Sequence, residues 1–314
     1  MTDSRSDNLW AITCYFNPVG YRRRLENYRI FKQRLKVPLV AVELSFDGVF
    51  ELGAGDADVL VQLCSRTVLW QKERLLNVAL KFLPPACDKV AWLDCDILFE
   101  SDDWIEHASR ALDEFALVHL FQDRNELPMD FTPDAPNFET FNLKSQSVAR
   151  HLVNRRISAE EASKPNRLMN GSTAGLAWAS RRDILDKHGL YDAFIVGGGD
   201  KAILLAAMGM SDQLAKAREM NHWRTEHYQA WAKPYSSTVN RCVGHIAGRV
   251  FHLWHGDLIN RNHSQRHHLF ARFDFDPYTD IALDPSGCWR WNSDKSEMHA
   301  FVRQYFQSRK EDGA

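Results

Sequence analysis

Lys89-Val90-Ala91-Trp92-Leu93-Asp94-Cys95-Asp96 indicates the fold, because a nearly continuous apolar run ends abruptly in two aspartates. Residues 89–93 lack polar alternation, which predicts a strand buried on both faces of a sheet. Leucines at helical spacing predict a helix over residues 70–83, just before this strand. Ser101 is the predicted N-cap of the helix that follows it. The stretch therefore predicts the helix–strand–helix pattern of an α/β protein.

The rest of the chain extends this pattern in both directions. We predict further strands at residues 9–16, 37–44, 115–121, 173–179 and 250–253, and a loop at residues 123–136. We predict further helices at residues 21–35, 201–208, 260–270 and 294–310, and one that begins at Arg181. Alternation of strands and helices predicts a mostly parallel sheet flanked by helices.

Composition limits the function classes. The chain has 314 residues, 45% of them hydrophobic, and a net charge of -2, so its overall charge does not favour binding to nucleic acid or to an anionic membrane. Neither a secretory signal nor a transmembrane run is expected, which predicts a cytoplasmic protein. The six cysteines lack CxxC spacing and are expected to be reduced thiols.

Asp94 and Asp96 follow the predicted strand directly. Ligands of open α/β sheets bind beyond the carboxyl ends of the strands, and two carboxylates one residue apart can approach one hard cation. Oxygen ligands suit Mg²⁺ or Mn²⁺, which bridge phosphates. The sequence therefore predicts a metal site at this edge. The alternative is that one aspartate begins a turn and the other is solvated.

The segment Trp92-Leu93-Asp94-Cys95-Asp96-Ile97-Leu98-Phe99 resembles the DxD region of GT-A-fold glycosyltransferases. The preceding Trp70-Gln71-Lys72-Glu73-Arg74-Leu75-Leu76-Asn77 is similar to the helix that lies beside the donor nucleotide in those families. The resemblance implies a nucleotide-sugar donor, by default a UDP-sugar with GDP possible, and an acceptor hydroxyl. It implies a nucleotide-binding half at residues 1–125, an acceptor half at residues 126–285 and a helical tail at residues 286–314.

Gly197-Gly198-Gly199-Asp200 is the candidate catalytic loop. Consecutive glycines permit positive φ and close approach of a ligand, and Asp200 begins a predicted helix. Its order after Asn170-Gly171-Ser172-Thr173-Ala174-Gly175-Leu176-Ala177-Trp178 and Arg181-Arg182-Asp183 resembles the acceptor half of inverting enzymes. The resemblance implies that Asp200 is the general base, although those families often carry Glu-Asp where this chain has Gly199-Asp200. The alternative is a helix N-cap.

His252 and His255 follow the last predicted strand. Imidazole is a common metal ligand, and the resemblance implies that one of the two completes the metal shell. The surrounding stretch is basic and includes His245, Arg249, Arg261, His263, Arg266, His267, His268 and Arg272. These residues would contact a diphosphate or form a solvated helix face.

The resemblance also implies donor contacts elsewhere. At the end of the first strand Thr13 or Tyr15 would contact the nucleobase, and an arginine of residues 22–24 would meet the diphosphate. The other expected nucleotide contacts are Asp47, Arg74, Asn77, Asp94 and Cys95.

Two other function classes remain open. Leu93-Asp94-Cys95-Asp96 also resembles the first motif of haloacid-dehalogenase-type phosphatases, in which the first aspartate is a nucleophile. However, about 90 residues precede it, and Leu204 stands where that family carries a further aspartate. A non-catalytic nucleotide- or carbohydrate-binding protein is the third reading, but such a protein has no need of a base at Asp200.

Overall fold

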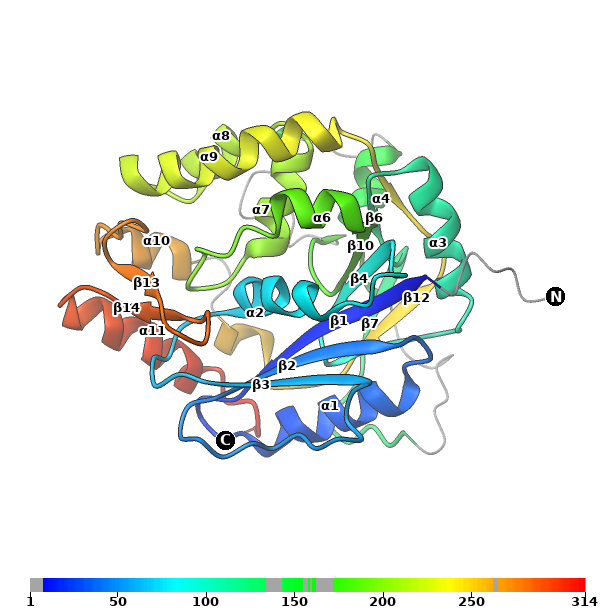
Figure 1. Ribbon diagram of the computed structural model, residues 1–314, viewed down its shortest axis with the longest axis horizontal. Coiled ribbons are helices and arrows are strands. Elements are labelled where there is room, and N and C mark those ends of the chain that lie inside the picture. Colours follow the sequence, from blue (N-terminus) through cyan, green and yellow to red (C-terminus); the bar gives the residue numbers. More distant parts are fainter. Residues whose placement is uncertain are drawn as a thin grey trace.

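The computed structural model describes residues 8–133, 143–154, 158, 160–161, 172–261 and 265–313. Helices lie on both sides of a central sheet (Figure 1). This confirms the predicted fold class, a mixed and mostly parallel sheet flanked by helices.

The central sheet has seven strands in the order β11-β6-β10-β4-β1-β2-β3. Its strands are β1 Leu9–Phe16, β2 Leu39–Ser45, β3 Val59–Cys64, β4 Lys89–Leu93, β6 Leu117–His119, β10 Ala177–Arg181 and β11 Val243–His245. β10 runs antiparallel to both β4 and β6, whereas the other neighbouring strands are parallel. A strand from the second half of the chain thus separates two strands from the first.

A second sheet of five strands lies next to the central one, in the order β5-β12-β7-β8-β9. Its strands are β5 Ile97–Phe99, β7 Asp123–Glu126, β8 Leu143–Ser147, β9 Ser172–Thr173 and β12 Arg249–His252. β5 and β12 are antiparallel, and His252 pairs with Ile97. This register brings His252 beside Asp96, the residue that precedes β5.

Helices cover both faces of the central sheet. The helices are α1 Arg22–Arg34, α2 Lys72–Ala79, η1 Leu80–Phe82, α3 Trp104–Glu114, α4 Val148–Val153, α6 Arg182–His188, α7 Gly199–Ala207, α8 Ser211–Ala217, α9 His222–Val239, η3 Leu258–Arg261, α10 Arg266–Ala271 and α11 Ser296–Ser308. A separate hairpin joins β13 Ile281–Leu283 to β14 Trp289–Trp291. One apolar core joins the sheet to α2, α6, α7 and α9, and another joins it to α1 and α3. Among the described helices, none is long and apolar enough to span a bilayer.

Strand alternation on β1 divides its side chains between these two cores. Cys14 and Phe16 belong to the α2 side, whereas Tyr15 belongs to the α1 side. Each core therefore packs against one face of the central sheet, and β1 is buried on both faces.

Several predicted elements differ from the structure. Residues 123–126, predicted as loop, form β7, in which Arg124 pairs with Glu126 and Asp123 pairs with Arg150 of α4. The strand predicted at residues 173–179 is two strands in different sheets, separated where Leu176 has a φ of 85°. The predicted helix at residues 260–270 contains η3 and α10 instead. Asn170, Gly171 and His263 lie outside the described residues.

Candidate active site

A cavity of about 590 Å³ lies at the carboxyl ends of β1 and β4. Eight lysine and arginine side chains line its described part, against four carboxylates, although the whole chain is slightly acidic. The carboxylates are Asp94, Asp96, Asp200 and Glu219. This size suits a small-molecule ligand, and the charge favours an anionic one.

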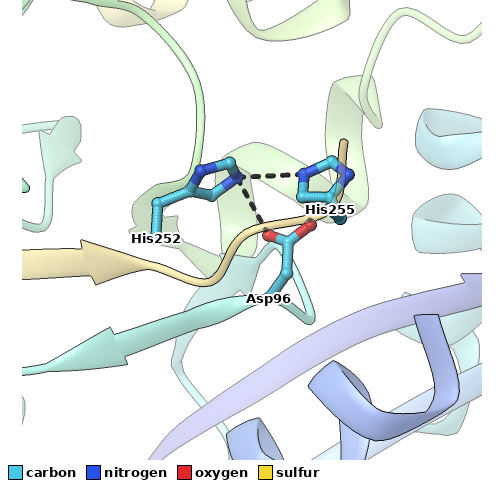
Figure 2. A group of neighbouring side chains, drawn as sticks. All are labelled: Asp96, His252 and His255. Atoms are coloured by element: carbon cyan, nitrogen blue, oxygen red, sulfur yellow. Dashed lines mark hydrogen bonds and ion pairs between the residues drawn. The ribbon is translucent and has the colours of Figure 1, made fainter. Parts of the chain in front are cut away.

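Asp96, His252 and His255 line this cavity. Their side chains form a compact group (Figure 2). His255 Nε2 lies 3.1 Å from Asp96 Oδ2 and 3.1 Å from His252 Nε2, and His252 Nε2 lies 3.6 Å from Asp96 Oδ1. Ligand atoms of one divalent ion have similar separations when each lies about 2.1 Å from the metal. Asp96 Oδ1 is buried and has no hydrogen-bond partner among the described residues. These residues therefore fit a divalent cation.

Two further carboxylates hold the outer nitrogens of the histidines. His252 Nδ1 lies 2.7 Å from Glu126 Oε2, and His255 Nδ1 lies 3.2 Å from Glu311 Oε1. Assigning the Nδ1 protons to these bonds leaves both Nε2 lone pairs directed at Asp96. Burial lowers the pKa of His252 to about 3 and that of His255 well below its usual value, so both imidazoles are neutral at pH 7.

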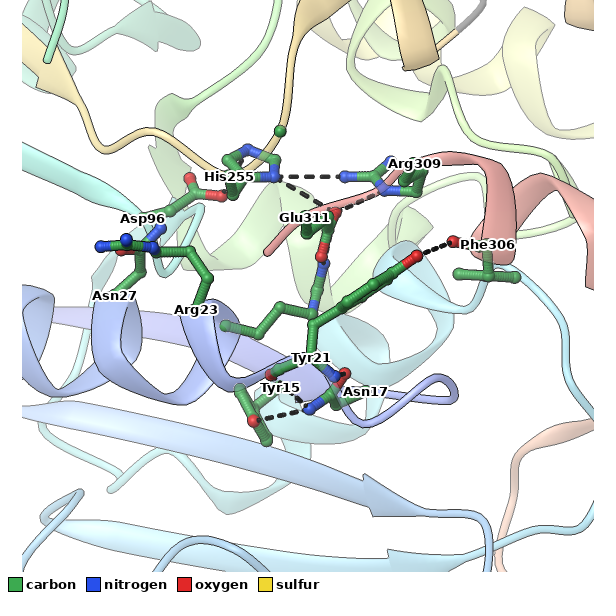
Figure 3. Close-up of polar contacts among 12 residues, drawn as sticks. Tyr15, Asn17, Tyr21, Arg23, Asn27, Asp96, His255, Phe306, Arg309 and Glu311 are labelled. Atoms are coloured by element: carbon green, nitrogen blue, oxygen red, sulfur yellow. Dashed lines mark hydrogen bonds and ion pairs between the residues drawn. The ribbon is translucent and has the colours of Figure 1, made fainter. Parts of the chain in front are cut away.

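The segment after α11 reaches this group from the far end of the sequence (Figure 3). Glu311 is 1% exposed and accepts hydrogen bonds from Arg24 and Arg309 as well as facing His255. Burial alone would raise the pKa of Glu311, but Arg24 and Arg309 hold it well below its usual value. Gly256 has a φ of 85°, and a Cβ there would meet the backbone of residues 309–311. The predicted tail therefore packs directly against the site.

Asp94 and Asp200 meet at one lysine. Lys72 Nζ lies 2.5 Å from Asp94 Oδ1 and 2.7 Å from Asp200 Oδ2. Burial raises the pKa of Asp200, and the Lys72 ammonium opposes this rise. Asp200 Oδ1 is buried and has no hydrogen-bond partner among the described residues. Lys72 therefore fixes one oxygen of Asp200, and the Trp92 side chain also lowers the pKa of this carboxyl group.

Glu73 packs directly against Gly199. A Cβ at Gly199 would collide with the Glu73 carboxyl group, so Glu73 occupies the space of a side chain at position 199. Burial raises the pKa of Glu73 to about 8. Gly198, with a φ of 97°, is the N-cap of α7, and Asp200 lies in its first turn. The alternative of an N-cap at Asp200 is therefore wrong.

The predicted donor contacts do not all face the cavity. Cys95 lines it, and burial raises the pKa of its thiol to about 12. Thr13 donates to Leu93 O, and Tyr15 donates to Glu51, on the opposite side of β1 from Cys14 and Phe16, which do line the cavity. Nucleobase contact by Thr13 or Tyr15 stays a prediction.

Three other predicted nucleotide contacts are not among the described residues that line the cavity, and each binds another part of the protein instead. Asp47 is exposed and accepts from Ser45 and the Val49 amide within its own turn. Arg74 and Asn77 both bind Asp192, and Asn77 also binds the backbone of Leu190. These bonds fasten α2 to the loop after α6. Their predicted roles in nucleotide binding are untested.

The basic stretch divides between buried and exposed positions. Arg261, Arg266 and His267 are buried and line the cavity. His268 is exposed at its rim, and Arg272 is exposed outside the described lining. Arg24 also lines the cavity, where it pairs with Glu311.

Sequence reasoning missed several functional candidates, among them Lys72, Arg124, Glu126 and Glu311. Lys72 lies in α2, where a charged residue next to apolar residues at helical spacing could have indicated a functional side chain. Arg124 and Glu126 lie in the stretch predicted as loop. No local pattern connects Glu311 to His255, because 56 residues separate them.

No protein-family model and no curated protein sequence matches the chain. Solved structures show a distant likeness. The glucosyl-3-phosphoglycerate synthase of Mycobacterium tuberculosis, in complex with Mn²⁺, UDP and glucosyl-3-phosphoglycerate, is 10% identical with a TM-score of 0.44, covering 86% of this chain and 79% of that chain. A mannosyltransferase from Pyrobaculum calidifontis, in complex with GDP-Man and Mn²⁺, is 16% identical with a TM-score of 0.37, covering 74% and 73%. TarS of S. aureus, in complex with UDP-GlcNAc, is 15% identical with a TM-score of 0.36, covering 62% and 51%.

Proposed function

We propose that this protein is a metal-dependent glycosyltransferase that moves a sugar from a nucleotide-sugar donor, by default a UDP-sugar, to an acceptor hydroxyl with inversion. The observation that carries this proposal is the Asp96–His252–His255 group beside a separate, partly buried carboxylate, Asp200, in one strongly cationic cavity. The lysine and arginine side chains of the cavity complement the negative charge of a diphosphate. Asp96 would bind the metal, and Asp200 would accept the proton.

The metal would be held by Asp96, His252 and His255, with Asp94 as a further candidate ligand. Two imidazoles favour Mn²⁺ over Mg²⁺, since Mg²⁺ prefers oxygen ligands. When bound, the metal supplies positive charge that stabilises the leaving diphosphate. Arg124 and Arg261 contribute charge from the protein, because both interact electrostatically with Asp96 in the same cavity.

Asp200 is the proposed general base. A hydroxyl becomes an effective nucleophile when a carboxylate accepts its proton during attack. Lys72 orients Asp200 and links it to Asp94, so that the base and the DxD segment are held in a fixed relation. Inversion follows if Asp200 activates the acceptor directly.

A thermal-shift panel tests the proposed function. UDP- and GDP-sugars, each with and without Mn²⁺, should raise the melting temperature only when the metal and the correct nucleotide are both present, because ligands that bind the native state stabilise it. The stabilising donor should also release its nucleoside diphosphate slowly. If no nucleotide sugar stabilises the protein and the protein releases phosphate from p-nitrophenyl phosphate, the haloacid-dehalogenase-type phosphatase would be favoured instead.

Replacing Glu311 with glutamine should weaken Mn²⁺ binding by about 10- to 100-fold, because carboxylates that orient metal-ligating histidines contribute that much affinity. Mn²⁺ affinity is measured by titration calorimetry and by the electron paramagnetic resonance signal of the free ion. Glu297→Gln, at an exposed position of α11, is the matched control and should not change affinity. Unchanged Mn²⁺ affinity in a folded Glu311→Gln protein would exclude this positioning role.

A further inference from the structure

Two arginines form one wall of the cavity beside the glycine run. A Cβ at Gly198 would lie 2.7 Å from Arg218 Nη2, and one at Gly197 would lie 3.1 Å from Arg266 Nη2. Both glycines also have positive φ, 97° and 81°. The backbone that leads into Asp200 is thus in close contact with two guanidinium groups, which only glycine allows at these positions.

Neither arginine has a carboxylate partner among the described residues. Arg218 lies over the ring of Phe194 at 5.6 Å, and its Nη1 is buried with no hydrogen-bond partner in the described part of the chain. Arg266 is 7% exposed and donates to the hydroxyl of Tyr305. Glu219 lines the same wall, but it accepts from His268 at 2.8 Å.

The electrostatics of this wall are unfavourable without a ligand. Burial lowers the pKa of Arg218, and the neighbouring charges of Arg266 and Arg224 lower it further. Burial and the charge of Arg218 also lower the pKa of Lys201, which lines the same cavity, to about 7. Guanidinium groups that are wholly or partly buried near one another are costly until an anion satisfies them, and they bind carboxylate or phosphate in a forked geometry.

We propose that Arg218 and Arg266 bind an anionic group of the acceptor, a phosphate or a carboxylate. This inference rests on the proposed function and names the acceptor class. The diphosphate of the donor would lie elsewhere, beside Asp96, where Arg124 and Arg261 are placed. Because Gly198 is two residues before Asp200, an acceptor anchored at Arg218 would present a nearby hydroxyl to the proposed base.

Anion binding to the protein saturated with UDP and Mn²⁺ tests the proposal. Inorganic phosphate and D-glycerate, with neutral glycerol for comparison, are titrated by calorimetry, so that the phosphate and carboxylate sources are distinguished. At least one of the two anions should bind, and glycerol should not. Arg218→Met should weaken that binding at least about 30-fold, as expected when one partner of a buried charge pair is removed.

Control variants keep the outcome interpretable. Arg218→Met should leave UDP–Mn²⁺ affinity unchanged. Arg261→Met should lower the affinity for UDP and leave the affinity for the anion unchanged. Arg218→Lys should recover part of the anion affinity, and Arg303→Met, at an exposed position of α11, should change neither. The proposal is overturned if UDP and Mn²⁺ bind but neither anion then binds, or if Arg218→Met binds the anion normally. Absence of UDP–Mn²⁺ binding in the unmutated protein would instead reject the proposed function.

Discussion

Replacing Asp96 with asparagine should abolish Mn²⁺ binding and, with it, release of nucleoside diphosphate from the donor. Asp96 is the one carboxylate in the described metal-ligand group, and an amide cannot supply the charge that a divalent cation requires. The substitution is nearly isosteric, and the neutral side chain still fills the space beside His252 and His255. The fold should therefore survive, and circular dichroism with thermal unfolding checks that it does.

The measurement is Mn²⁺ titration followed by electron paramagnetic resonance, with product release assayed in parallel. Asp102→Asn is the matched control, because Asp102 is exposed a few residues further along the chain. Asp94→Asn separates two roles: lower Mn²⁺ affinity would make Asp94 a ligand, and unchanged affinity would limit it to holding Lys72. Full Mn²⁺ affinity in Asp96→Asn would refute the metal site.

Replacing Asp200 with asparagine should reduce turnover by about 10²- to 10⁴-fold, the usual contribution of a general base. The amide can still contact Lys72 but cannot accept the acceptor proton. Because Asp200 is not in the metal-ligand group, Mn²⁺ and donor affinities should stay close to those of the unmutated protein.

Turnover is measured with the nucleotide sugar that stabilises the protein, together with donor affinity by calorimetry. Asp183→Asn, at an exposed aspartate of α6, is the control and should be fully active. Normal turnover in Asp200→Asn would rule out Asp200 as the base. Loss of donor binding together with turnover would show that Asp200 organises the site instead.

The sequence predicts an element best where its pattern of apolar residues directly reflects how the element is buried. Residues 89–93 form β4 as predicted, because an uninterrupted apolar run has few alternatives to a doubly buried strand. Its position placed Asp94 and Asp96 at the edge of the sheet, and both line the cavity. His252 and His255 were also identified from sequence, and the structure brings both to Asp96 rather than one.

Contacts between distant segments could not be predicted. β7 is composed of Asp123, Arg124, Asn125 and Glu126, a polar stretch with no strand pattern, and it forms because β12 and β8 flank it. Arg74 and Asn77 were expected beside a nucleotide, but Asp192, more than 100 residues away, binds both. Such partners are fixed by tertiary packing, which a single sequence does not encode in its local periodicity.

The packing of residue 311 against His255 has a consequence for biosynthesis. A ribosome completes the strands of both sheets well before it translates Glu311, so a nascent chain holds Asp96, His252 and His255 while His255 still lacks the carboxylate that orients it. A protein truncated just after α11 would lack Glu311, and His255 Nδ1 would lose this carboxylate partner. If the proposed metal site is correct, full metal affinity would therefore require residue 311 as well as the folded sheets.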